Sequence, residues 1–167
     1  MSEVCKPMSA TEVDAFLGGV RQAVVGTNRR DGPPQMSPVW YLWEGRQLIF
    51  ATSPQAAKYR NLQRDVRMSV CVHTEHPDSR TVMMCGRAEL LPLGSPESPE
   101  LAWRVVRRYF GSDDEAREYM DSTEWERNLA VVIFKPERVV AQDWNECTDR
   151  AAGDYARCEL RLDNTSL

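Results

Sequence analysis

The sequence contains few of the residues from which common catalytic and metal sites are built. It has two histidines, His73 and His76, and five cysteines with no C-x-x-C pair among them. The cysteines are Cys5, Cys71, Cys85, Cys147 and Cys158. Residues three apart on a strand point to opposite faces, so the two histidines are not expected to share a metal ion. We predict no disulfide framework and no metal site, with haem ligation by a histidine left open.

Motifs that mark common nucleotide-binding and hydrolytic enzymes are also missing. The sequence has no G-x-G-x-x-G, no Walker loop, no H-E-x-x-H and no G-x-S-x-G. Neither histidine has a nucleophile at a recognisable spacing, so a catalytic triad is not predicted. The sequence therefore assigns no catalytic residue.

Long apolar runs and a basic excess are absent as well. No window reaches the roughly 18 continuous apolar residues of a membrane span, and residues 1–14 contain no apolar signal-peptide core. Lys and Arg number 21 against 25 for Asp and Glu, giving a net charge of −4, which argues against a nucleic-acid partner. We expect a cytoplasmic protein with reduced cysteines and no membrane span.

Length and composition fit one globular domain. The 167 residues, 42% hydrophobic and 28% charged, are enough to bury an ordinary core. We expect this domain to span residues 1–144. Residues 145–167 are polar and lack a period, so we expect a loose tail, or an arm laid on a partner chain.

Short apolar runs between turn signals predict a mainly antiparallel β protein. The expected strands are 23–27, 35–43, 47–52, 68–73, 81–91, 129–134 and 138–144. Asp31-Gly32 is a hairpin signal, Pro38 favours an edge or a bulge, and Lys135-Pro136 divides the last two runs. The first three runs are expected to form a meander.

Four helices are expected among these strands. The first has a capping box, Ser9 with Glu12, and the second is predicted to begin at Ser53-Pro54, with Ser as the cap. Two more follow over 101–109 and 113–127, the last with seven acidic residues that we interpret as a solvated face. The order of elements predicts an α+β domain built on an antiparallel barrel.

One corner of the predicted fold has the features of an anion site. Residues 52–54 (Thr-Ser-Pro) end a strand and open a helix, where free N–H groups and two hydroxyls favour negative charge. Lys58 lies one turn further along. Three more basic residues follow at Arg60, Arg64 and Arg67. The alternative is a helix with a basic solvated face.

Aromatic residues lie on the two strands that lead to this corner. They are Trp40, Tyr41, Trp43 and Phe50. Alternation places Trp40 and Tyr41 on opposite faces. Such side chains are usually core, but a flat ring against these strands, with a phosphate at the helix start, would use both features. The sequence therefore suggests a nucleotide-like cofactor.

Several segments resemble the flavin- and deazaflavin-binding split β-barrel family, often called pyridoxamine-5′-phosphate-oxidase-like. They are D-G-P-P-Q-M-S-P-V-W-Y (Asp31–Tyr41), L-I-F-A-T-S (Leu48–Ser53) and A-K-Y-R-N-L-Q-R-D-V-R (Ala57–Arg67). Two others, C-G-R-A-E-L (Cys85–Leu90) and P-E-R-V-V-A-Q-D-W (Pro136–Trp144), are similar to the branch that uses coenzyme F420. The resemblance covers roughly residues 10 to 144.

The resemblance implies a homodimeric split β-barrel with flanking helices and two cofactor sites at the subunit interface. The groups that would hold the cofactor phosphate are Lys58 and those around Thr52, Ser53 and Asn61. The strand backbone over Gln35–Trp40 would hold the ring, and the partner chain would add residues near position 80. The implied cofactor-binding residues are Gln35, Ser37, Pro38, Val39, Trp40, Ala51, Thr52, Ser53, Lys58, Asn61, Arg80 and Thr81. This chain departs from the family pattern at Ala56, Val66 and Thr81.

The activity implied by the resemblance is hydride transfer from reduced F420 to an electron-poor double bond of a small molecule. Two alternatives are an FMN-dependent oxidase or reductase, and a non-catalytic split barrel that binds a flavin or haem. Tyr41, His73 or water would supply the proton that the product needs. Pyridoxamine phosphate oxidase activity itself is not expected, because the Arg- and His-bearing C-terminal segment of those oxidases has no counterpart here.

Overall fold

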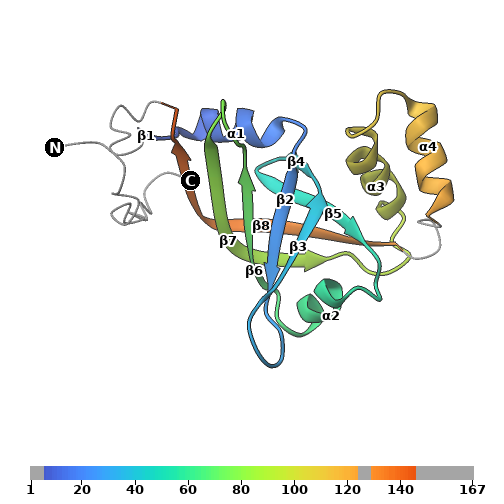
Figure 1. Cartoon of the computed structure of the whole chain (residues 1–167). Helices are drawn as coiled ribbons and strands as arrows, with labels where there is room; N and C mark the ends of the chain where they lie inside the picture. The colour runs from blue at the N-terminus through green and yellow to red at the C-terminus, as the bar shows by residue number, and fades with distance from the viewer. Residues whose placement is uncertain (1–5, 124–128, 146–167) are drawn as a thin grey trace.

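The computed structural model describes residues 6–123 and 129–145, and Figure 1 shows one curled sheet with helices around it. The strands are β1 (Lys6–Pro7), β2 (Gln22–Thr27), β3 (Gln35–Trp40), β4 (Leu42–Glu44), β5 (Gln47–Thr52), β6 (Arg67–His73), β7 (Arg80–Leu90) and β8 (Ala130–Asp143). The helices are α1 (Ala10–Gly18), α2 (Ala57–Arg64), α3 (Ser98–Arg107) and α4 (Asp113–Ser122). Apart from Asn145, the expected tail over 145–167 lies outside the described residues.

The sheet closes on itself without a complete ring of hydrogen bonds. Its order is β3-β2-β6-β7-β8-β5-β4, with β1 added to β8, and the paired strands are antiparallel. β3 contacts β5 although the two are not neighbours in this order. The expected meander is therefore wrong at one step: β4 pairs with β5, while β3 runs alongside without pairing. We call this place the seam, and it makes the molecule an α+β split barrel, as predicted.

The barrel interior is filled by alternate residues of the strands. Phe50 of β5 and Phe134 of β8 are completely buried there together with Phe16 and Leu17 of α1. Each such side chain contributes about 1.5–3 kcal/mol by leaving water. The predicted capping box of α1 is confirmed, because Ser9 Oγ accepts from the Glu12 N–H at 3.3 Å and the Ser9 N–H donates to the Glu12 carboxylate at 2.7 Å.

The predicted start of the second helix is wrong. α2 begins at Ala57, and its N-cap is Ala56, whose side chain makes no capping hydrogen bond. Ser53 lies four residues before α2, where its carbonyl accepts from the Ala56 N–H at 3.0 Å and its hydroxyl accepts from the Gln55 N–H at 3.1 Å. Ser53-Pro54 therefore forms a tight turn, a conformation that this dipeptide also favours.

Two predicted strand divisions also differ from the structure. The runs 129–134 and 138–144 are one continuous strand, β8. Pro136 lies opposite Gly86, and a register shift between Cys85 and Gly86 leaves the next residue, Glu137, without a partner as a bulge. Conversely, the run 35–43 is split at Tyr41 into β3 and β4. None of the helices within residues 6–123 and 129–145 is long and apolar enough to cross a membrane.

Candidate cofactor site

A cavity of about 320 Å³ lies at the seam, which we call the seam pocket. Its described lining residues are Gln22, Pro38, Val39, Trp40, Ala51, Thr52, Ser53, Lys58 and Tyr119. β3 forms one wall, the end of β5 with the turn after it forms the other, and α2 and α4 each add a side chain. Seven of the twelve residues implied by the resemblance therefore line this one cavity. The other two lining residues, Gln22 and Tyr119, are not in that set.

Lys58 makes one end of the seam pocket cationic. Its side chain is half-buried, and burial lowers the pKa of its ammonium. No described carboxylate forms an ion pair with it. It stands in the first turn of α2, whose N–H groups have no partner within the helix and no side-chain cap. A half-buried cation beside uncapped N–H groups is suited to an anion.

The hydroxyl groups of β5 and the following turn complete this end. Thr52 is almost fully buried, and Ser53 is exposed. Because Ser53 Oγ acts as an acceptor toward the Gln55 N–H, its own hydrogen remains available to an anion. The donor set is therefore chemically suited to a phosphate group.

The other basic residues near α2 are engaged elsewhere or point to solvent. Arg67 donates two hydrogen bonds to Asp65, at 2.9 and 2.8 Å, and this pairing holds the pKa of that carboxyl well below its usual range. Arg64 donates to the Asn28 carbonyl, and Arg60 is exposed. Among the described lining residues, the positive charge available to a ligand is that of Lys58.

The opposite end of the seam pocket is aromatic. Trp40 stacks on Tyr109 with ring centroids 4.7 Å apart and planes at 11°, and it lies 5.2 Å from Tyr119 of α4. Tyr119 was missed by the sequence analysis, which treated 113–127 as a solvated acidic face. Its spacing from buried Ala116, three residues earlier, was the signal that this helix turns one side inward.

Trp40 and its neighbour Tyr41 face opposite sides of the strand, as predicted. Tyr41 is completely buried in the barrel core, where burial raises the pKa of its hydroxyl to about 12. That hydroxyl has no hydrogen-bond partner among the described residues. It does not reach the seam pocket, so Tyr41 is not placed to protonate a product there. His73 is exposed at the end of β6.

Three residues implied by the resemblance face the barrel interior instead of the pocket. The side-chain amide of Asn61 donates to Thr27 Oγ1 at 3.1 Å and to Gln35 Oε1 at 3.2 Å, and Gln35 donates weakly to Ser37 Oγ at 3.4 Å. This network ties α2 to β2 and β3. Any role of Gln35 and Ser37 toward a ring would then use their backbone, and β3 is an edge strand with one free side.

Arg80 and Thr81 lie away from the seam pocket of their own chain. They are on β7, three strands from β3, which at a strand spacing of roughly 4.8 Å is about 14 Å. The Arg80 guanidinium pairs with Asp78 at 2.6 Å and lies 5.0 Å above the Phe16 ring.

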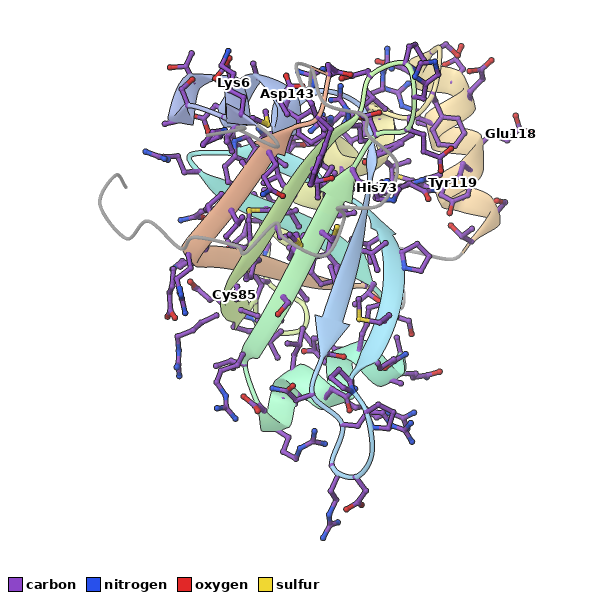
Figure 2. The ribbon with its side chains drawn as sticks, turned by 60° about the vertical axis from the view of Figure 1, so that its left-hand side comes forward. Lys6, His73, Cys85, Glu118, Tyr119 and Asp143 are labelled. Atoms are coloured by element: carbon purple, nitrogen blue, oxygen red, sulfur yellow. The ribbon has the colours of Figure 1, made fainter. Side chains whose placement is uncertain are left out.

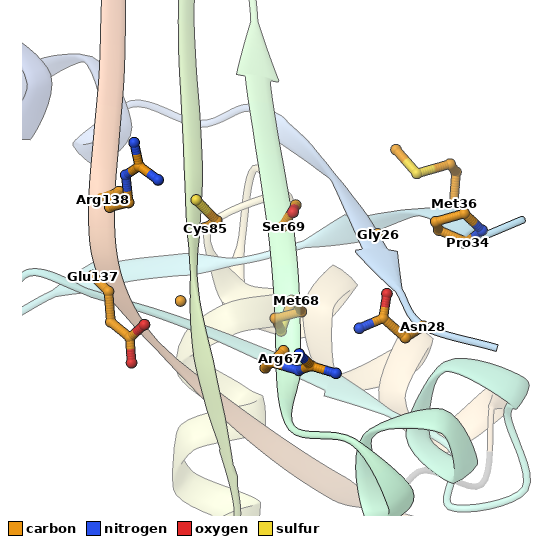
Figure 3. Close-up of a pocket in the computed structure, with 11 residues that line it drawn as sticks. Gly26, Asn28, Pro34, Met36, Arg67, Met68, Ser69, Cys85, Glu137 and Arg138 are labelled. Atoms are coloured by element: carbon orange, nitrogen blue, oxygen red, sulfur yellow. The ribbon is translucent and has the colours of Figure 1, made fainter. Parts of the chain in front are cut away.

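The outer face of the sheet carries a second hollow. It lies over β2, β3, β6, β7 and β8, and we call it the open face. Two adjoining cavities of about 330 and 340 Å³ share Met36, Ser69, Cys85 and Arg138, and Figure 3 shows the first of them. The second is lined mainly by apolar side chains, including Val24, Met83 and Val140. The described residues contain no group of His, Cys, Asp or Glu that could hold a metal ion.

The fold is a split barrel, and the lining of its seam pocket is chemically suited to an anion. Comparison with known families shows the class of protein to which such a chain belongs. The family model described as "Pyridoxamine 5'-phosphate oxidase" matches residues 9–143. The chain therefore belongs to this family.

Solved structures share the fold. A conserved hypothetical protein from Mycobacterium tuberculosis is 25% identical, with a TM-score of 0.70, and the match covers 85% of this chain and 88% of that one. An FAD-binding protein from Mesorhizobium loti is 23% identical, with a TM-score of 0.63 and coverages of 83% and 96%. An F420 reductase is 20% identical, with a TM-score of 0.57 and coverages of 75% and 94%.

Proposed function

We propose that this protein is a homodimeric oxidoreductase that uses coenzyme F420 to reduce an electron-poor double bond of a small molecule. The observation that carries the proposal is the seam pocket, with the half-buried Lys58 ammonium at one end and the edge strand β3 as one wall. Membership of the family and the fold shared with an F420 reductase support it. When bound, the reduced cofactor supplies a hydride, and the substrate also gains one proton.

The chain's own residues would bind and orient the cofactor. Lys58, the first-turn N–H groups of α2 and the Ser53 hydroxyl would hold the phosphate. The free side of β3 would offer backbone N–H and C=O groups to the edge of a flat ring. Partial burial strengthens the attraction between Lys58 and the phosphate, because the local dielectric is lower than in water.

The choice of F420 over FMN rests on the sequence segments Cys85–Leu90 and Pro136–Trp144 and is tested by direct binding. Purified full-length protein is titrated with F420 and with FMN side by side, following cofactor fluorescence. We expect F420 to bind more tightly. Tighter FMN binding would establish the FMN-dependent alternative on the same fold, and binding without turnover would favour a non-catalytic carrier.

Replacement of Lys58 by alanine tests the phosphate site. Lys58→Ala removes a charge-assisted hydrogen bond, so F420 binding should weaken by about ten- to a hundredfold. Arg60→Ala is the matched control, because Arg60 is an exposed cation on the same helix outside the pocket lining. Equal, small losses for the two variants would show that α2 is only a helix with a basic surface.

A second variant probes the departure from the family at the start of α2. Ala56 is the N-cap residue, and it is partly buried next to the first turn. The family resemblance implies an arginine at this position, so Ala56→Arg adds a cation beside the proposed phosphate position. We expect it to tighten F420 binding, measured by the same titration. Unchanged affinity would place the phosphate away from this end of the helix.

The geometry also reduces the number of candidate donors for the proton that the product gains. Tyr41 is enclosed in the core, which leaves water and His73 of the three candidates. His73 is exposed on β6 and does not line the seam pocket of its own chain, although it is the cross-strand neighbour of Thr81, which the resemblance places in the partner's site. We propose water as the proton source, and a variant of His73 tests this choice. His73→Gln should then leave turnover within about twofold of the wild-type rate.

A further inference from the structure

We propose that α4 and the turn before it build a subsite for the hydride acceptor, and that the acceptor is a flat, conjugated and uncharged molecule held against Trp40 and Tyr119. This inference rests on the proposed function, because it names the substrate class of the same pocket. It is carried by three features of the described residues: the two aromatic rings in the lining, the rings that support them, and the distribution of charge.

Trp40 and Tyr119 bring two aromatic surfaces into one cavity from distant parts of the chain. Both line the seam pocket, and their ring centroids are 5.2 Å apart with planes at 46°. Figure 2 shows Tyr119 on the side of α4 toward the sheet, whereas Glu118 projects away from it. Aromatic walls of this kind favour planar ligands through stacked and edge contacts.

Two further aromatic rings pack behind Trp40 and Tyr119 and hold them in position. Tyr109 stacks on Trp40 at 4.7 Å, and its hydroxyl donates to the Arg21 carbonyl at 2.6 Å and accepts from the Tyr41 N–H at 2.9 Å. Phe110 lies 5.8 Å from Trp40 and 5.2 Å from Tyr119. Neither supporting ring is among the pocket-lining residues. The wall is therefore held in place before a ligand arrives, which reduces the cost of ordering it.

The two ends of the pocket differ in the charge of their lining residues. Among its described residues Lys58 is the one charged side chain, and the phosphate end uses it. Around the rings the lining offers Gln22, Pro38 and Val39, none of them ionised. An ionised acceptor would lose its hydration there without gaining a partner charge, which is unfavourable. A neutral conjugated molecule meets no such cost.

Two naphthoquinones that differ in charge serve as probes: menadione, which is neutral, and 1,4-naphthoquinone-2-sulfonate, which is anionic. Binding to full-length protein is measured by equilibrium dialysis, with and without oxidised F420, and KM is measured with reduced F420. With oxidised F420 present, so that its phosphate uses Lys58, we expect menadione to bind at least about tenfold more tightly than the sulfonate. Tyr119→Leu should weaken menadione binding and raise its KM by about tenfold, while F420 affinity stays within about twofold.

Glu118→Gln is the matched control, because Glu118 precedes Tyr119 on α4 but projects away from the sheet and does not line the pocket. It should change menadione affinity by less than about threefold. Unchanged menadione affinity in Tyr119→Leu overturns the inference, and so does a parallel loss of F420 affinity, which would assign Tyr119 to the cofactor. If menadione binding depends on Tyr119 but F420 does not bind, the subsite stands and the proposed cofactor is wrong.

Discussion

The polar side chains of this protein fall into two kinds: those that line the seam pocket, and those that are buried in the core without a hydrogen-bond partner among the described residues. Tyr41 belongs to the second kind, because its hydroxyl is buried without a partner among the described residues. Such a group has lost water and gained nothing in return. We therefore expect Tyr41→Phe to leave the free energy of unfolding unchanged or to raise it by up to about 1 kcal/mol, measured by urea denaturation. Turnover should stay at the wild-type rate, whereas a large loss would restore Tyr41 as the proton donor.

Lys58 belongs to the first kind, and its titration gives a pH test. Burial lowers its pKa below the ordinary 10.5, so the unfolded chain holds this proton to higher pH than the folded chain does. In the cofactor-free protein, Lys58 therefore lowers stability at neutral pH. This penalty shrinks as pH rises above the lowered pKa of the folded state and is gone above the ordinary pKa of 10.5. Phosphate binding needs the charged form, so F420 affinity should fall over the same alkaline range.

The measurement is the dissociation constant of F420 as a function of pH, for wild type and for Lys58→Ala. The alkaline fall should be present in the wild type and absent in the variant. A fall of the same size in Lys58→Ala would assign the titration to another group, or to the cofactor itself.

At the scale of elements, the bulge in β8 is the feature most sensitive to substitution. Gly86 lies opposite it, and a Cβ at this position would overlap the Lys135 carbonyl oxygen and come within 2.9 Å of Glu137 N and Pro136 Cα. These are backbone atoms of a paired strand and have little room to move. Gly86→Ala should therefore lower the free energy of unfolding by about 3 kcal/mol or more, measured by urea denaturation.

Gly18→Ala is the control for this substitution, because a Cβ there meets no atom within 4 Å. Gly18 ends α1, where alanine favours the helix by up to about 1 kcal/mol. The free energy of unfolding of the Gly18→Ala variant should be unchanged or slightly higher than that of the wild type. Equal effects of the two substitutions would mean that β8 adjusts freely around residue 86.

The elements also show what sequence patterns can and cannot predict. The capping box at Ser9 and the alternation of Trp40 and Tyr41 were predictable, because each depends on neighbours within a few residues. The start of α2 was not, because Ser53-Pro54 suits a helix cap and a tight turn equally well. The continuity of β8 through Pro136 depends on Gly86, about 50 residues earlier in the chain, and no local pattern records such a pairing.

The residues of the candidate site also include some that local sequence motifs predict and some that depend on contacts between distant parts of the chain. The seven predicted residues in the seam pocket come from family motifs on β3, β5 and α2, which follow one another closely in the sequence. Tyr119 enters the pocket only because its neighbours Tyr109 and Phe110 pack on Trp40, about 70 residues earlier. Asn61 and Gln35 were assigned to the cofactor, but their side chains join two elements inside the barrel.

At the scale of the whole molecule, the open face is an apolar surface of the described residues that is suited to a partner. Met36 is 60% exposed there and lines a cavity together with Val24, Met83 and Val140. A contiguous apolar hollow of this kind is typical of interaction sites. The proposed occupant is a second copy of this chain, because Thr81 lies on the same sheet, too far from its own seam pocket to take the role implied by the family resemblance.

We therefore expect sedimentation equilibrium to give about twice the chain mass of 19.1 kDa. Met83→Lys places a charge in the apolar cavity, whose lining already contains the like charge of Arg138. It should produce a folded monomer that binds F420 at least about tenfold more weakly, because a buried unpaired charge is strongly unfavourable. Leu93→Lys is the matched control, since Leu93 is also an exposed apolar residue, at 57%, but lies outside the lining of both open-face cavities. It should remain dimeric. A wild-type monomer that binds F420 tightly would refute the interface, because one chain would then complete the site alone.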